Sequence, residues 1–179
     1  MTKLLQQFER IVRRALGSTD APPEEHRDIH AFDERDIHPL LPTVVKELFD
    51  DGHYAQSTFE AFKFVDKEIQ RLSGETESGY RLMMKVLSDT DPIVRLTPCS
   101  STSEKDEQKG YQFLFAGAVL AIRNPRGHEY AVRDTPDTCL AHLSLASLLL
   151  RRLQAAGHDI QSLHLNEESN VQRSRSAGY

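Results

Sequence analysis

The chain has 179 residues, of which 39% are hydrophobic and 27% are charged, and its formal net charge is -5 at pH 7. This length predicts one main domain with appendages, and it is sufficient to bury a sizeable core. The acidic balance excludes a generally basic nucleic-acid binder, although it leaves open a local basic site on an acidic body.

No apolar stretch reaches the roughly 20 residues that are needed to cross a bilayer, and the first residues lack the order of a signal peptide. We therefore expect a cytoplasmic protein that does not contact the membrane. The two cysteines, Cys99 and Cys139, have neither CxxC spacing nor a histidine at zinc-finger distance. Both are expected to be reduced thiols.

The first predicted element is an amphipathic helix over residues 3–16, within an N-terminal segment 1–17 that ends at a glycine. Residues 18–36 are acidic, contain two prolines and show little apolar periodicity, so they are expected to form a linker or arm. His26 and His30 in this arm have the i, i+4 spacing of a helical zinc site. Because the arm is not clearly helical, no metal is expected there.

Helical periodicity returns at residue 37 and continues to residue 156, which we predict to be the main domain. A short amphipathic helix is predicted over 39–51. A long helix follows over 53–73 and a third, shorter one over 79–88. The apolar seam predicted for the long helix is Phe62, Val65, Ile69 and Leu72, at alternating steps of three and four.

Residues 89–110 are polar and predict a long connection between helices. A strongly apolar helix is then predicted over 111–124. The last helix follows an N-cap at Asp134 or Thr135, just before Pro136. Its predicted apolar positions are Leu140, Leu143, Ala146, Leu149, Leu150 and Leu153. No segment shows strand alternation, so the fold class is predicted to be all-α, an up-and-down bundle of four to five helices, with a polar tail over 157–179.

The most unusual local pattern is the stretch AIRNPRGHEY, residues 121–130. Arg123 and His128 are five positions apart, which would separate them by about 140° around an uninterrupted helix. Pro125 should end or kink the helix between them, and Gly127 adds backbone freedom at the same place. A bend here could bring the guanidinium and the imidazole toward one substrate group.

This combination of side chains suits attack on RNA. Histidine titrates near neutral pH and can exchange a proton with a 2'-hydroxyl or a leaving oxygen. Arginine binds phosphate oxygens and stabilises charge that develops on the phosphorus, and Asn124 offers polar groups for orientation. Such a centre requires neither a metal nor a cofactor. From spacing alone, the competing interpretation is a capped and solvated helix end.

The hexapeptide RNPRGH, residues 123–128, resembles the R-x(4 to 6)-H signature of HEPN domains. Four longer segments resemble one bacterial branch of that superfamily, the Ymh-like proteins. These segments are IHPLLPTVVKELFDDGHYAQSTFEAFKFVDKEIQRLSG, GYRLMMKVLS, FLFAGAVLAIRNPRGH and LSLASLLLRRL. Agreement in order and spacing across residues 37–153 is more specific than the hexapeptide.

The resemblance implies a homodimer with two signature motifs in one cleft. It also implies a metal-independent endoribonuclease that leaves 2',3'-cyclic phosphate and 5'-hydroxyl ends. Arg123 is then the phosphate and transition-state stabiliser, Asn124 an orienting residue and His128 the general base or acid. Arg126 is expected to contact phosphate. A role as a toxin or antiphage-defence effector, with an antitoxin or other partner protein, also follows from the resemblance.

Glu60 and Lys63 on the long helix are possible supporting residues, with a solvated ion pair as the alternative. His142 lies within a leucine-rich face and is expected to be a satisfied buried histidine. The alternative function is a non-catalytic HEPN-like module that binds a nucleotide or a protein. Because the chain has both Arg123 and His128, the sequence favours the enzyme.

Overall fold

The computed structural model describes residues 7–9, 12, 29–128 and 132–161. The chain divides into two compact units, Met1–His30 and Ala31–Tyr179. In the first unit, residues 7–9 and 12 are helical, within the predicted N-terminal helix. His26, most of the predicted arm and the tail from residue 162 lie outside the described residues.

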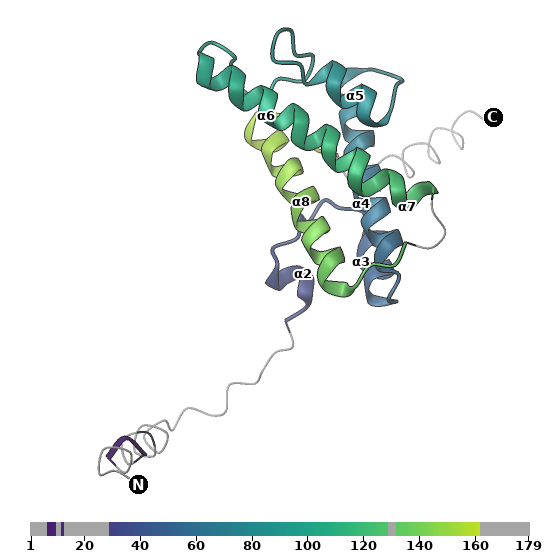
Figure 1. Ribbon diagram of the computed structural model, residues 1–179, viewed down its shortest axis with the longest axis vertical. Coiled ribbons are helices and arrows are strands. Elements are labelled where there is room, and N and C mark those ends of the chain that lie inside the picture. Colours follow the sequence, from purple (N-terminus) through teal and green to yellow (C-terminus); the bar gives the residue numbers. More distant parts are fainter. Residues whose placement is uncertain (1–6, 10–11, 13–28, 129–131, 162–179) are drawn as a thin grey trace, which may run out of the picture. The chain divides into compact units, whose positions relative to one another are not determined.

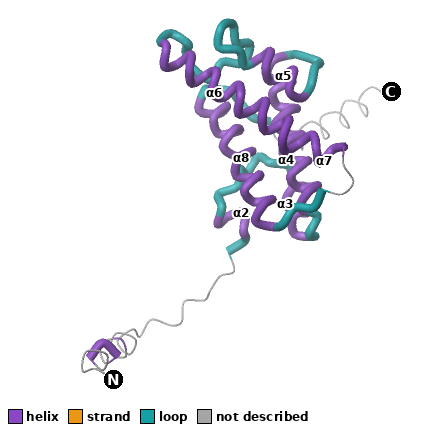
Figure 2. Tube along the Cα trace, viewed as in Figure 1, coloured by secondary structure: helices purple, strands orange, loops and turns teal. Residues whose placement is uncertain are grey.

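The second unit is built from helices. These are α2 (Ala31–Glu34), α3 (Thr43–Asp50), α4 (Tyr54–Ser73), α5 (Gly79–Val86), α6 (Thr102–Ala118), the π-helical segment η1 (Val119–Arg123), α7 (Asn124–His128) and α8 (Pro136–Ala155). The described part of the chain contains no strand (Figure 2), which confirms the predicted all-α class. None of its helices combines the length and apolar character needed to span a membrane.

Helix α4 is the centre of the bundle, because it contacts α3, α5, η1, α7 and α8. In Figure 1, α6, η1 and α7 form one long rod that runs diagonally past α4. The predicted seam of α4 is confirmed: Phe62, Val65 and Ile69 are fully buried, and Leu72 packs against the core at its edge. The predicted apolar positions of α8 are also buried.

The long polar connection predicted over residues 89–110 is wrong in its second half, because α6 already begins at Thr102. The helix starts with a capping box, in which the Ser101 hydroxyl accepts from Glu104 N at 3.2 Å and the Glu104 carboxylate accepts from Ser101 N at 3.2 Å. The buried Gln108 amide holds the remaining connection. It donates to Leu87 O and Val94 O, each at 3.2 Å.

The segment before α3 is fixed to α8. His38 is 3% exposed, its backbone N–H donates to Ser147 Oγ at 2.9 Å, and its Nε2 lies 2.8 Å from Gln154 Oε1. Because Leu40 N donates to Nδ1 of His38 at 3.2 Å, the neutral ring carries its proton on Nε2. The last residues of the predicted arm, from Ala31, lie in the same compact unit as the bundle, and Phe32 among them packs against its core.

Helix α8 begins as the sequence predicts. Thr135 is the N-cap, its hydroxyl accepts from Thr138 N at 3.2 Å, and Pro136 occupies the first turn. The side chain of Asp134, the other candidate for the cap, is therefore free for a different contact.

Candidate functional site

The Arg123 turn is π-helical. The backbone N–H of Asn124 donates to Val119 O, an i to i−5 bond, and the chain then stays helical through Pro125 as α7. The prediction that the helix could end at Pro125 is therefore wrong. The wider turn gives the proline ring room beside the preceding carbonyls, which an α-helical turn would not give. Single π turns occur frequently at functional sites.

The Arg123 side chain lies over an aromatic ring. Its Cζ is 5.5 Å from the centroid of the Phe59 ring on α4, and Nη1 donates to Asn124 Oδ1 at 3.2 Å. Nε is buried and has no hydrogen-bond partner within the described part of the chain. Buried polar atoms are normally paired, so an unpaired one calls for an explanation such as a bound water, ion or ligand, and among the described residues Arg152 Nε is unpaired in the same way.

The role of Gly127 differs from the predicted one. It lies in α7 and provides room for a neighbour: a Cβ added here would come within 2.8 Å of Phe59 Cε2. Real Cβ contacts are essentially never this short. The glycine therefore permits close packing between α7 and the Phe59 ring, and this packing holds α7 beside α4.

We expect Gly127→Ala to displace the Phe59 ring and to lower the free energy of unfolding. In a Phe59→Ala background the same substitution should instead stabilise the protein by up to about 1 kcal/mol, because alanine favours helix more than glycine does. Urea denaturation of the four proteins measures this coupling. Equal effects of Gly127→Ala in both backgrounds would show that the ring contact is unimportant.

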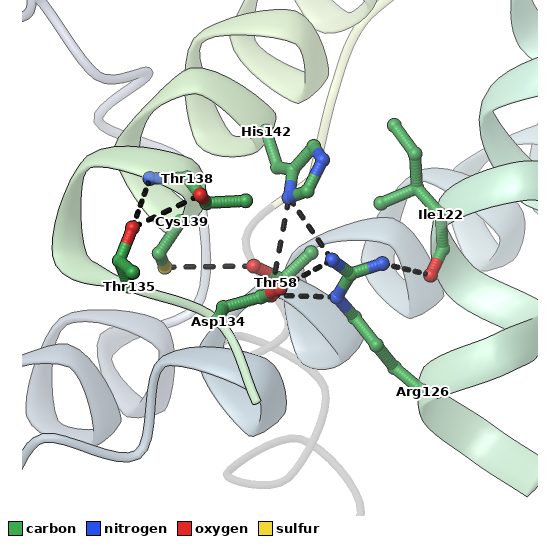
Figure 3. A network of polar contacts seen from close by, with 8 residues as sticks. All are labelled: Thr58, Ile122, Arg126, Asp134, Thr135, Thr138, Cys139 and His142. Carbon is green, nitrogen blue, oxygen red and sulfur yellow. Dashed lines mark hydrogen bonds and ion pairs between the residues drawn. The ribbon is translucent and has the colours of Figure 1, made fainter. Parts of the chain in front are cut away.

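Arg126 lies one turn further along, and its guanidinium is held by a carboxylate. Nε and Nη2 donate to the two oxygens of Asp134 at 2.7 and 2.5 Å, and Nη1 donates to Ile122 O at 2.7 Å (Figure 3). The Arg126 and Asp134 side chains are only 8% and 4% exposed. This geometry favours a role for Arg126 in positioning the helix end, and its predicted contact with phosphate would require this ion pair to open.

His142 on α8 completes this network. Its Nδ1 lies 3.4 Å from Arg126 Nη2 and 3.9 Å from Asp134 Oδ2. Burial and the charge of Arg126 lower the pKa of His142, and Asp134 opposes them only in part. Burial opposes ionisation of Asp134, but the hydrogen bonds and charge of Arg126 outweigh it, so the pKa of Asp134 falls below its usual value. The side chain of His142 is 21% exposed, less buried than the sequence predicts.

Beneath the ion pair, the Thr58 hydroxyl of α4 donates to Cys139 Sγ at 3.5 Å. Burial raises the pKa of the Cys139 thiol, so it stays protonated at neutral pH. Both Cys99 and Cys139 are free cysteines, as predicted.

The low pKa of His142 predicts a pH-dependent stability. A folded-state pKa below the unfolded value of 6.5 means that the folded protein favours the neutral ring, so this contribution is complete above pH 6.5 and is lost as the pH falls through the folded pKa. As the pH falls from 7.5 to about 5, the free energy of unfolding of the parent should therefore decrease more than that of His142→Gln. A difference that does not change with pH would contradict this account.

Glu60 and Lys63 form an exposed ion pair beside the Arg123 turn. Lys63 Nζ lies 2.9 Å from Glu60 Oε2, and the two side chains are 46% and 28% exposed. Lys63 Nζ also lies 6.0 Å from the centroid of the Phe59 ring. Through this ring, the structure places Lys63 in the same cluster as Arg123.

The structure thus brings together Arg123, Asn124 and Lys63 around Phe59 and turns Arg126 toward Asp134. The backbone of His128 ends α7, and its side chain lies outside the described residues. Sequence reasoning did not find Phe59 or the roles of Asp134 and His142. Phe59 had one weak signal, its i, i+4 spacing from Lys63 on the same helix.

The fold and this cluster define an all-α protein in which a π-helical turn holds an arginine over an aromatic ring. Residues 35–153 match the family described as Protein of unknown function (Hypoth_ymh), and the chain belongs to that family. The matched residues include the whole Arg123 turn, and the resemblance to Ymh-like proteins is thereby confirmed. No curated protein and no solved structure is significantly similar to the chain.

Proposed function

We propose that this protein is a metal-independent endoribonuclease of the HEPN superfamily. The observation that carries the proposal is the half-exposed Arg123, held on Phe59 within a segment of the R-x4-H form. Its buried Nε has no hydrogen-bond partner among the described residues. Support also comes from the order of the four family segments along the chain. Arginine, asparagine and histidine can together supply phosphate binding, orientation and proton transfer.

In the proposed reaction, His128 takes the proton of a ribose 2'-hydroxyl, and the 2'-oxygen attacks the adjacent phosphorus. The bond between phosphorus and the 5'-oxygen breaks, and this oxygen takes up a proton. The products are a 2',3'-cyclic phosphate and a 5'-hydroxyl. Arg123 stabilises the negative charge on the phosphoryl oxygens in the transition state, and Asn124 fixes the guanidinium through its Oδ1.

An apolar stripe on the outside of α6 and η1 supports the proposed homodimer. Phe113, Leu114 and Leu120 are 54%, 47% and 52% exposed. They alternate with exposed Gly110 and Gly117 at steps of three and four, the spacing of a helix-packing seam. Because the stripe leads to the Arg123 turn, a second copy packed on it would lie beside the site.

The proposed cellular role is that of a toxin or antiphage-defence effector, whose partner is an antitoxin or another protein of the same system. The net charge of -5 limits general attraction to nucleic acid. Recognition of RNA would therefore depend on the local cluster of Arg123 and Lys63.

The test is to incubate the purified protein with total RNA in the presence of EDTA and to determine the chemistry of the new ends. Cleavage that leaves 2',3'-cyclic phosphate and 5'-hydroxyl ends is expected. RNA that stays intact across a range of protein concentrations would overturn the proposed nuclease activity and favour the alternative, a non-catalytic module that binds a nucleotide or a protein.

A further inference from the structure

Phe59 is an unusual side chain for the outer face of a helix. It is partly exposed on α4, between buried Thr58 and the exposed Glu60–Lys63 pair. Two cations approach its ring, with Arg123 Cζ at 5.5 Å and Lys63 Nζ at 6.0 Å from the centroid. Its edge packs on the backbone of α7 at Gly127, so the ring is held firmly at the candidate site.

The two cation contacts are not equivalent. Arg123 is the closer one and is also fixed by Asn124, whereas Lys63 lies at about the 6 Å limit of a cation–π contact and is 46% exposed. The Lys63 ammonium can therefore leave the ring at little cost. A flat group could take its place while the ammonium binds a nearby anion.

We propose that Phe59 is the stacking platform for an unpaired RNA base and that Lys63 binds a phosphate of the same strand. An aromatic ring flanked by cations is the usual means of holding single-stranded nucleic acid, because every base has a face that can stack. Bases inside an A-form duplex are already stacked and cannot reach the ring. This inference rests on the proposed function and assigns the binding residues of the same site.

Binding can be measured separately from cleavage with a fluorescent 2'-O-methyl RNA of 12 nucleotides, which has no free 2'-hydroxyl to attack. The parent should bind the single strand more tightly than the same sequence in a duplex. Phe59→Leu should weaken single-strand binding by about tenfold or more, since base stacking on an aromatic ring contributes on this order. Phe59→Tyr keeps the ring and should bind like the parent.

A matched pair of lysines distinguishes a local contact from general charge. Lys63 pairs with Glu60 at 2.9 Å and is 46% exposed, and Lys85 pairs with Glu75 at 2.8 Å and is 47% exposed. Lys63→Ala should weaken binding of the single strand, whereas Lys85→Ala should not. This comparison also tests the inference if Phe59→Leu proves to be unfolded by circular dichroism.

The outcomes separate the inference from the proposed function. If the parent cleaves total RNA and folded Phe59→Leu binds the single strand as tightly as the parent does, the role of Phe59 as a stacking platform is wrong and the proposed nuclease activity stands. If single-strand binding depends on Phe59 and Lys63 but no RNA is cleaved, the stacking role of Phe59 stands and the proposed nuclease activity is wrong. Equal loss in Lys63→Ala and Lys85→Ala would also contradict the inference.

Discussion

Asp134→Ala should lower the free energy of unfolding by about 3–5 kcal/mol, the usual cost of removing one partner of a buried ion pair. The Arg126 guanidinium, 8% exposed, would lose both of its hydrogen bonds to the carboxylate and keep its charge. The loss is large because whole domains are stable by only about 5–15 kcal/mol. Chemical denaturation followed by circular dichroism measures the change.

Asp89 provides the control, because it pairs with Lys109 at 3.4 Å while the two side chains are 30% and 51% exposed. Asp89→Ala should cost less than about 1 kcal/mol. The double variant Arg126→Leu with Asp134→Leu should be more stable than the sum of the single changes predicts. Strictly additive effects would show that the two side chains do not support each other.

Arg123→Ala is expected to slow RNA cleavage by about 10² to 10³-fold, the usual result of removing one donor that stabilises a developing oxyanion. The substitution removes a half-exposed side chain from the surface of Phe59, so the bundle should remain folded. Single-turnover cleavage at saturating protein separates this loss from weaker binding.

The control for charge is Arg95→Ala. Arg95 is exposed and lines a cavity of about 580 Å³ with Glu104 and Arg152, near the opposite end of α6 from Arg123. Its removal subtracts the same charge from the protein and should leave cleavage unchanged. A similar loss in both variants would point to general electrostatics and not to the Arg123 turn.

The helical core could be predicted from the sequence because its signals are local. Alternating steps of three and four identified the buried seam of α4, and Pro136 after a threonine identified the start of α8. The start of α6 was missed although Ser101 and Glu104 have capping-box spacing, since the residues around them are uniformly polar. The first turns of α6 have no apolar face, and they are stabilised instead by the capping box and by the hydrogen bonds of the buried Gln108 amide.

The candidate site could be predicted only as a set of residue types. The sequence located Arg123, Asn124 and Pro125, but a π turn has no signature that distinguishes it from a kink. The partners of the site come from distant parts of the chain: Asp134 holds Arg126 across a loop, and Phe59 supports Arg123 from α4. Such contacts depend on helix packing, which a single sequence does not specify.

The most direct measurement is RNA cleavage in EDTA by the parent and by His128→Ala at equal concentration and equal helical content. A rate about 10² to 10⁴-fold lower for the variant is predicted, as expected when a proton-transfer group is lost. The few remaining products should still carry 5'-hydroxyl ends. Equal rates for the two proteins would remove His128 from the reaction and leave the Arg123 turn without its proposed chemistry.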